Sequence, residues 1–165
     1  MKNPLIFFSL KVVVSKSTIM EALITNDLSQ MAKKGPCIDF MFAYTDHDVQ
    51  KMLSFCDPNG EVYFKPLGED GRGRIGELGK ALWSSLIDAF PDIHTTVHAS
   101  IVDGEDIRCQ VLISGTQAKD FAGIECKGNG FDSDHIFVFQ LNEENIINSI
   151  QIEWDHADFS RQLQA

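Results

Sequence analysis

Two side chains in the last third of the sequence can transfer protons in an apolar setting. Asp155 follows an apolar run and adjoins Trp154, and His135 leads into another apolar run. A carboxylate in an apolar cavity has a raised pKa, which suits it to act as a general base. A nearby histidine can relay a proton or donate to an oxyanion. We therefore take Asp155 and His135 as candidate catalytic residues for proton transfer.

Both candidates also have a purely structural interpretation. Asp is a preferred helix N-cap, so Asp155 can simply cap a short terminal helix that ends near Leu163. His135 follows a polar stretch over 132–134 and can lie at the solvent-exposed start of its strand. The sequence leaves these alternatives open.

Other residues are candidates for contacting a ligand. Trp83 and Phe121 could form apolar walls for a flat molecule, although each can equally be ordinary core. Tyr44 lies on the polar edge of a predicted helix, where its hydroxyl could enter a cavity. Amides orient carbonyl or hydroxyl groups but cannot act as bases. The remaining predicted ligand contacts are Gln110, Gln117, Gln151 and Trp154.

Several kinds of site are not supported by the motifs present. Residues 71–76 match GxGxxG by letter, but no buried strand precedes them, so nucleotide binding is not expected. The sequence contains no P-loop and no GxSxG elbow. His94 and His98 share a strand face without further donors, and no CxxC pair exists, so no metal site is predicted. We expect no cofactor.

The hydrophobic pattern is helical first and alternating later. From Ile93 onward it alternates as strands, with a hairpin signal near 103–105. This order predicts an α+β fold in which a curved antiparallel sheet wraps around N-terminal helices. The expected elements are helices over 17–33, 36–56 and 78–90, a turn over 57–60, a strand over 61–66, a glycine-rich loop over 68–76, strands over 93–101, 107–113, 131–141 and 146–154, and a short terminal helix.

Charge and cysteine content restrict the partners and the compartment. The formal net charge of −10 repels polyanions, so we expect neither nucleic-acid nor membrane binding. Residues 1–34 carry a charge of +3 and are predicted to be an N-terminal extension, possibly helical, before a domain over 35–165. Four well-separated cysteines indicate free thiols in a reducing compartment, and we expect a cytoplasmic location.

A series of motifs resembles the SnoaL-like polyketide cyclases. The series spans roughly residues 36–163 in the family's order. It consists of Ala43-Tyr44-Thr45-Asp46-His47-Asp48-Val49, Ala89-Phe90-Pro91-Asp92-Ile93, Gly115-Thr116-Gln117, Phe121-Ala122-Gly123-Ile124 with Gly128, and Asp155 with Gln162-Leu163. The chain departs from the family pattern at Gln117, where a His is common, at Gln110, where an Arg is common, and at Gln151, where a Trp is usual.

The resemblance implies a fold and a reaction. The fold is the cone-shaped α+β barrel of the nuclear transport factor 2-like superfamily, and the reaction is an intramolecular aldol closure without metal or cofactor. We expect a cyclase or isomerase acting on a hydrophobic, polyketide-like carbonyl compound, with Asp155 as the acid or base and His135 assisting. The alternative is a non-catalytic small-molecule-binding or dimeric scaffold protein of the same fold. Apolar residues on both faces of the strands, such as Ile136 and Val138, predict a homodimer through the outer sheet face.

Overall fold

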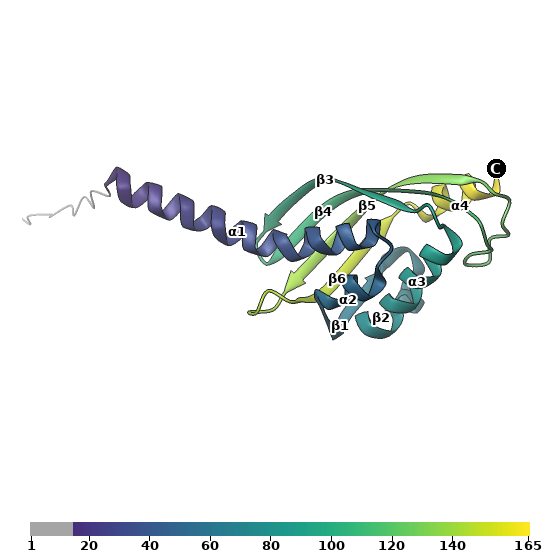
Figure 1. Ribbon diagram of the computed structural model, residues 1–165, viewed down its shortest axis with the longest axis horizontal. Helices are drawn as coiled ribbons and strands as arrows, with labels where there is room; N and C mark the ends of the chain where they lie inside the picture. The colour runs from purple at the N-terminus through teal and green to yellow at the C-terminus, as the bar shows by residue number, and fades with distance from the viewer. Residues whose placement is uncertain (1–14) are drawn as a thin grey trace, which may run out of the picture.

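Helices pack against one face of a curved, unclosed sheet, and the first helix projects far beyond it (Figure 1). The computed structural model describes residues 15–165. Most of the helical chain precedes the main strands, which confirms the predicted α+β class. The elements in chain order are α1 (Lys16–Thr45), α2 (Val49–Ser54), β1 (Cys56–Phe64), η1 (Lys65–Gly71), β2 (Arg72–Arg74), η2 (Ile75–Gly79), α3 (Lys80–Ala89), β3 (His94–Asp103), β4 (Asp106–Thr116), β5 (Gly130–Leu141), β6 (Ile147–Trp154) and α4 (His156–Gln164).

The six strands form one mixed sheet in the order β2-β1-β6-β5-β4-β3. The long strands β3 to β6 form an antiparallel meander, as their alternating pattern predicts. β1 lies parallel to β6, so the sheet is mixed and not wholly antiparallel. Gly60 makes this pairing possible, because a Cβ at Gly60 would lie 2.5 Å from the backbone oxygen of Asn148. The sheet therefore places the C-terminal ends of β1 and β6 side by side.

A single helix, α1, covers the helix predicted over 17–33 and the first ten residues of the one predicted over 36–56. Gly35 and Pro36 do not interrupt it, although both are helix-breaking signals. The second half of α1 is held against the sheet by buried Cys37, Phe40 and Tyr44, and this packing outweighs the lost backbone hydrogen bond at Pro36. The predicted helix break at residue 35 is therefore wrong. The family-like domain predicted from residue 35 onward stays a prediction.

The break in the helical region instead occurs at residues 46–48. His47 has a positive φ of 59°, and the Asp48 carboxylate accepts a hydrogen bond from the Lys51 amide at 2.9 Å to start α2. Two further expectations in this region are wrong. Residues 57–60 belong to β1 and not to a turn, and the expected loop over 68–76 contains β2, which pairs with β1. Three inner residues of the GxGxxG match therefore form an edge strand.

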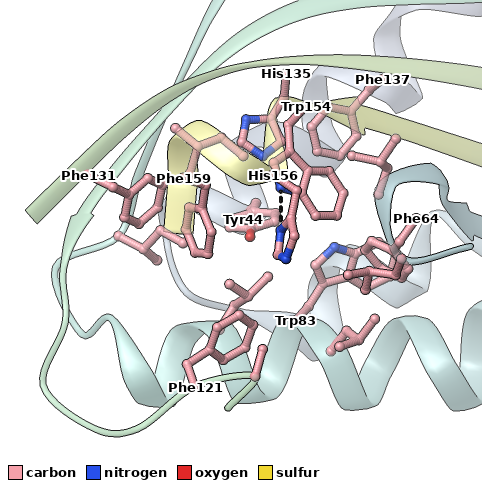
Figure 2. A pocket seen from close by; sticks show the side chains of 17 residues that line it. Tyr44, Phe64, Trp83, Phe121, Phe131, His135, Phe137, Trp154, His156 and Phe159 are labelled. Atoms are coloured by element: carbon pink, nitrogen blue, oxygen red, sulfur yellow. Dashed lines mark hydrogen bonds between the residues drawn. The ribbon is translucent and has the colours of Figure 1, made fainter. Parts of the chain in front are cut away.

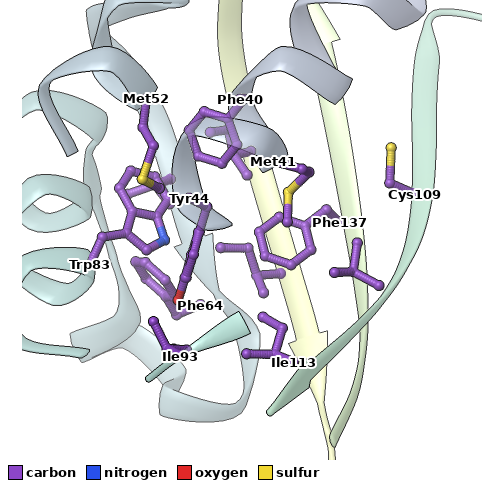
Figure 3. Close-up of a cluster of buried hydrophobic side chains, with 14 of the residues drawn as sticks. Phe40, Met41, Tyr44, Met52, Phe64, Trp83, Ile93, Cys109, Ile113 and Phe137 are labelled. Carbon is purple, nitrogen blue, oxygen red and sulfur yellow. The ribbon is translucent and has the colours of Figure 1, made fainter. Parts of the chain in front are cut away.

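Aromatic side chains fill the space between α1, α3 and the inner face of the sheet (Figure 3). Phe40 of α1 contacts Trp83 of α3 edge to face, with ring centroids 5.2 Å apart, and Phe139 of β5 at 5.6 Å. Alternation along β5 turns Phe137, Phe139 and His135 inward. One continuous core thus supports both the helices and the inner face of the sheet.

Three of the four cysteines are buried and all four are free, as expected from their spacing. Within residues 15–165, no group of three or more His, Cys, Asp or Glu side chains is arranged to hold a metal ion. None of the helices that the structure describes is both long and apolar enough to cross a bilayer.

Candidate active site

An apolar pocket lies between the inner face of the sheet, α3, α4 and the segment around Phe121 (Figure 2). Its volume is about 80 Å³, which is room for several waters. Aliphatic residues and aromatic rings form its walls. Those rings come from Phe64, Trp83, Phe121, Phe131, Phe137 and Phe159. Five residues bring side-chain nitrogen or oxygen into this lining, namely Tyr44, Trp83, His135, Trp154 and His156.

His135 is a buried, neutral histidine whose tautomer is fixed by the backbone. Its Nδ1 lies 2.9 Å from the carbonyl oxygen of Ser133. Because a carbonyl oxygen only accepts, Nδ1 must carry the proton, and Nε2 keeps its lone pair. Burial lowers the pKa of His135 to about 4, only partly offset by the Ser133 hydrogen bond and by nearby Asp134. His135 therefore presents a proton acceptor at neutral pH.

His156 has the opposite tautomer in its neutral form. The indole Nε1 of Trp154 lies 3.3 Å from His156 Nδ1. An indole nitrogen only donates, so Nδ1 of His156 accepts and Nε2 carries the proton. The Trp154 ring also stacks on His135, with centroids 5.5 Å apart and planes 20° apart. Trp154 thus separates an imidazole that accepts from an imidazole that donates, and it orients both.

Tyr44 supplies a hydroxyl from the end of α1. The residue is buried, and this burial raises the pKa of its phenol above the ordinary value, so the group stays protonated. Figure 2 shows its oxygen directed into the pocket. Among residues 15–165, no hydrogen bond engages this hydroxyl. Tyr44 is therefore available to donate a hydrogen bond to a bound molecule.

The pocket can accept a proton and stabilise a negative oxygen without any charged side chain. His135 Nε2 is the acceptor, and His156 Nε2 and the Tyr44 hydroxyl are the donors. Hydrogen bonds to a developing oxyanion are stronger in such an apolar, water-poor setting than in water. The arrangement suits the formation of an enolate from a carbonyl compound.

The structure brings five of the predicted site residues into the pocket. His135 and Trp154 lie on the sheet side, Trp83 comes from α3, and Tyr44 and Phe121 complete the group. The alternative in which His135 lies at a wet strand end does not apply, because the side chain is about nine-tenths buried. Their roles in binding or catalysis remain proposals.

Asp155 does not line the pocket. It is exposed, and its Oδ1 accepts a hydrogen bond from the Asp158 amide at 2.9 Å, as the N-cap of α4. Trp154 and His156 line the pocket on either side of Asp155, while Asp155 itself takes the capping position. The observed contact of Asp155 is therefore the structural alternative that the sequence left open.

The three glutamines also lie outside the pocket lining. Gln110 and Gln151 are exposed on the outer face of the sheet, because their neighbours in β4 and β6 turn inward. Gln117 is buried, and its Nε2 donates to the Ile124 carbonyl at 3.0 Å, which braces the segment that carries Phe121. None of the three is placed to orient a ligand in this pocket.

His156 is the functional candidate that sequence reasoning missed. Its position after the predicted cap made it look like the first residue of a surface helix. The available signal was its spacing from Trp154, because residues two apart across the end of a strand can share one face. Phe159, one helical turn later, stacks on the His156 ring with centroids 5.9 Å apart.

Comparisons with known proteins agree with this architecture. The family model for the SnoaL-like polyketide cyclase matches residues 38–164. No curated protein matches the chain. A putative SnoaL-like polyketide cyclase from Jannaschia sp. CCS1 superposes with a TM-score of 0.73 at 15% identity, covering 82% of this chain and 94% of that one. IdmH, a putative polyketide cyclase from Streptomyces antibioticus, gives 0.69 at 16% identity over 81% and 99%. TsrD from Streptomyces laurentii gives 0.69 at 21% identity over 80% and 94%.

These structural likenesses establish the nuclear transport factor 2-like fold that the sequence motifs led us to expect. The family model covers the whole segment that forms the sheet, α2, α3 and α4, together with the end of α1. The chain belongs to the SnoaL-like polyketide cyclase family.

Proposed function

We propose that the protein catalyses proton transfer at the carbon next to a carbonyl group in a hydrophobic, polyketide-like compound, leading to ring closure or isomerisation. The observation that carries the proposal is the His135–Ser133 hydrogen bond, which leaves a bare imidazole nitrogen in an aromatic pocket. Family membership and a fold shared with putative polyketide cyclases support the same substrate class. In the proposed reaction, the protein contributes only proton transfer and hydrogen bonds from its side chains.

The proposed reaction begins with removal of a proton. His135 Nε2 takes the proton from the carbon, and the electron pair of the C–H bond becomes the enolate. His156 Nε2–H and the Tyr44 hydroxyl donate hydrogen bonds to the enolate oxygen. The negative enolate raises the proton affinity of His135 above its value in the empty pocket. The enolate carbon then attacks a second carbonyl of the same molecule, whose oxygen takes the proton back from His135. In the isomerisation, the enolate takes that proton back from His135 at another carbon.

The test follows the first step without knowledge of the product. Aromatic β-diketones are incubated with the protein in deuterium oxide, and NMR measures deuterium incorporation beside the carbonyl. We expect His135→Gln to slow the exchange by at least about 100-fold, because a positioned base contributes that much or more. His98→Gln, which changes an exposed histidine on β3, serves as the control. Equal exchange by wild type and His135→Gln would remove His135 from the reaction.

A second candidate function is ligand binding without turnover. It is favoured by the lining, which contains no carboxylate and no Lys or Arg side chain in the described chain. The two tryptophans of the sequence, Trp83 and Trp154, both line the pocket, so intrinsic fluorescence reports its occupancy. Quenching by a diketone that shows neither deuterium exchange nor a change of mass would select this function.

A further inference from the structure

The first part of α1 carries a large apolar surface that nothing in residues 15–165 covers. Residues 16–34 project past the end of the sheet, over a length of about 28 Å (Figure 1). Six large hydrophobic side chains on this segment are between 48% and 67% exposed. They are Ile19, Met20, Leu23, Ile24, Leu28 and Met31. An exposed patch of this extent indicates an interaction surface.

Three residues of this surface, Ile24, Leu28 and Met31, begin a stripe with the spacing of a helix-pairing seam. Starting at Ile24, the positions 24, 28, 31, 35, 38 and 42 follow one another in steps of four and three residues. This heptad spacing keeps one stripe of a helix against a second helix. Phe42, at the end of the stripe, is 62% exposed although it lies beside the core-facing Met41. The stripe, called the α1 seam below, therefore faces away from the protein's own core.

We propose that two copies of this chain pair through their α1 seams in antiparallel orientation. In one register, Leu28 lies opposite the partner's Met31, and Ile24 lies opposite the partner's Gly35. Gly35 is suited to close approach, because a Cβ built there would have no neighbour within 4 Å. The same register places Asp27, beside the seam, opposite the partner's Lys34, and it forms this pair twice by symmetry.

The charges beside the α1 seam distinguish this register from the two registers that are shifted by one heptad. Asp27 and Lys34 form no ion pair within residues 15–165, so both are available to a partner. A shift of one heptad in either direction sets Lys34 against the partner's Lys34, or Asp27 against the partner's Asp27. Like charges in these flanking positions oppose pairing, so the register with two Asp27–Lys34 contacts is favoured.

A second copy fits the seam better than an anionic membrane surface does. Asp27 flanks the seam itself, and the β3–β4 and β5–β6 turns lie at the end of the sheet from which the helix projects (Figure 1). These turns carry the exposed acidic residues Asp103, Glu105, Glu143 and Glu144. Anionic lipid would repel these carboxylates.

The test compares the masses of matched variants of the full chain by sedimentation. We expect wild type to have twice the 18.4 kDa monomer mass. Ile24→Asp places a charge in the seam and should weaken the dimer by about 100-fold or more, since two copies of an apolar contact are lost. Ser29→Asp adds the same charge on the opposite side of the helix and should leave the dimer intact. Circular dichroism of both variants checks that the fold is retained.

Cysteine cross-linking then tests the orientation. An equimolar mixture of Ile24→Cys and Gly35→Cys chains should form a disulfide between unlike chains, while each variant alone should form none above the wild-type background. Self-linking of each variant alone indicates a parallel pair and overturns the proposal. A monomeric wild type also overturns the proposal. This holds both if residues 1–14 of the same chain cover the α1 seam and if the α1 seam binds anionic vesicles. Loss of the dimer in Val138→Asp but not in Ile24→Asp would assign the interface to the outer sheet face instead.

Discussion

Buried His135 makes the stability of the fold depend on pH. Its pKa is about 4 in the folded protein, against 6.5 for an unperturbed histidine. The unfolded chain therefore binds a proton at a higher pH than the folded one, and the stabilising contribution is present above pH 6.5 and is lost as the pH falls toward 4. At pH 5 the two pKa values give a loss of about 2 kcal/mol relative to neutral pH.

The assay is urea unfolding at several pH values between 7.5 and 4.5, for wild type and for His135→Gln. Glutamine does not titrate and keeps a polar side chain with a hydrogen-bond donor at this position. We expect the free energy of unfolding of wild type to fall more steeply with acid than that of the variant, by about 2 kcal/mol at pH 5. His98→Gln, at an exposed position, should follow wild type. Parallel curves for wild type and His135→Gln would refute the assignment of a buried, neutral imidazole.

Three other substitutions separate structural from functional roles. Asp155→Ala should lower the free energy of unfolding by about 1 kcal/mol, because the N-cap of α4 is lost, while deuterium exchange of the ligand continues at the wild-type rate. Slower exchange with an unchanged free energy of unfolding would assign Asp155 a role in the chemistry. Tyr44→Phe should retain ligand quenching of tryptophan fluorescence but slow deuterium exchange by about 100-fold, because one donor to the enolate oxygen is lost. Unchanged exchange would show that the Tyr44 hydroxyl does not donate to the enolate oxygen. Gly60→Ala should destabilise the protein by about 1–3 kcal/mol in urea unfolding, because its Cβ meets the Asn148 carbonyl; a neutral effect would contradict that close approach.

The strands of the second half could be predicted because each buries one face. In β5, the alternation through Phe137 and Phe139 also predicts that His135 faces the same side, and the structure places it there. Family motifs pointed to the same fold, which the family match and the solved structures confirm. Local pattern and burial agree in this part of the chain, so the sequence was sufficient.

The remaining features depend on contacts between distant segments. The parallel pairing of β1 with β6 joins residues nearly 90 positions apart, and no local signal predicts it. Packing of Phe40 and Tyr44 keeps α1 helical at residues 35 and 36, although glycine and proline disfavour a helix interior. The direction of Asp155 was ambiguous because the chain changes from strand to helix at that residue, where alternation ends. For the same reason, the sequence pattern did not predict that His156 lines the pocket.

Trp154 lies between a proton-accepting His135 and a proton-donating His156. Long-range nitrogen–proton NMR correlations at neutral pH, on protein labelled with ¹⁵N in histidine, measure directly which nitrogen of each ring carries the proton. We expect His135 to carry its proton on Nδ1 and to have a bare Nε2, and the neutral His156 ring to carry its proton on Nε2. A His135 ring protonated on Nε2, or on both nitrogens, would contradict the assignment of His135 as the base.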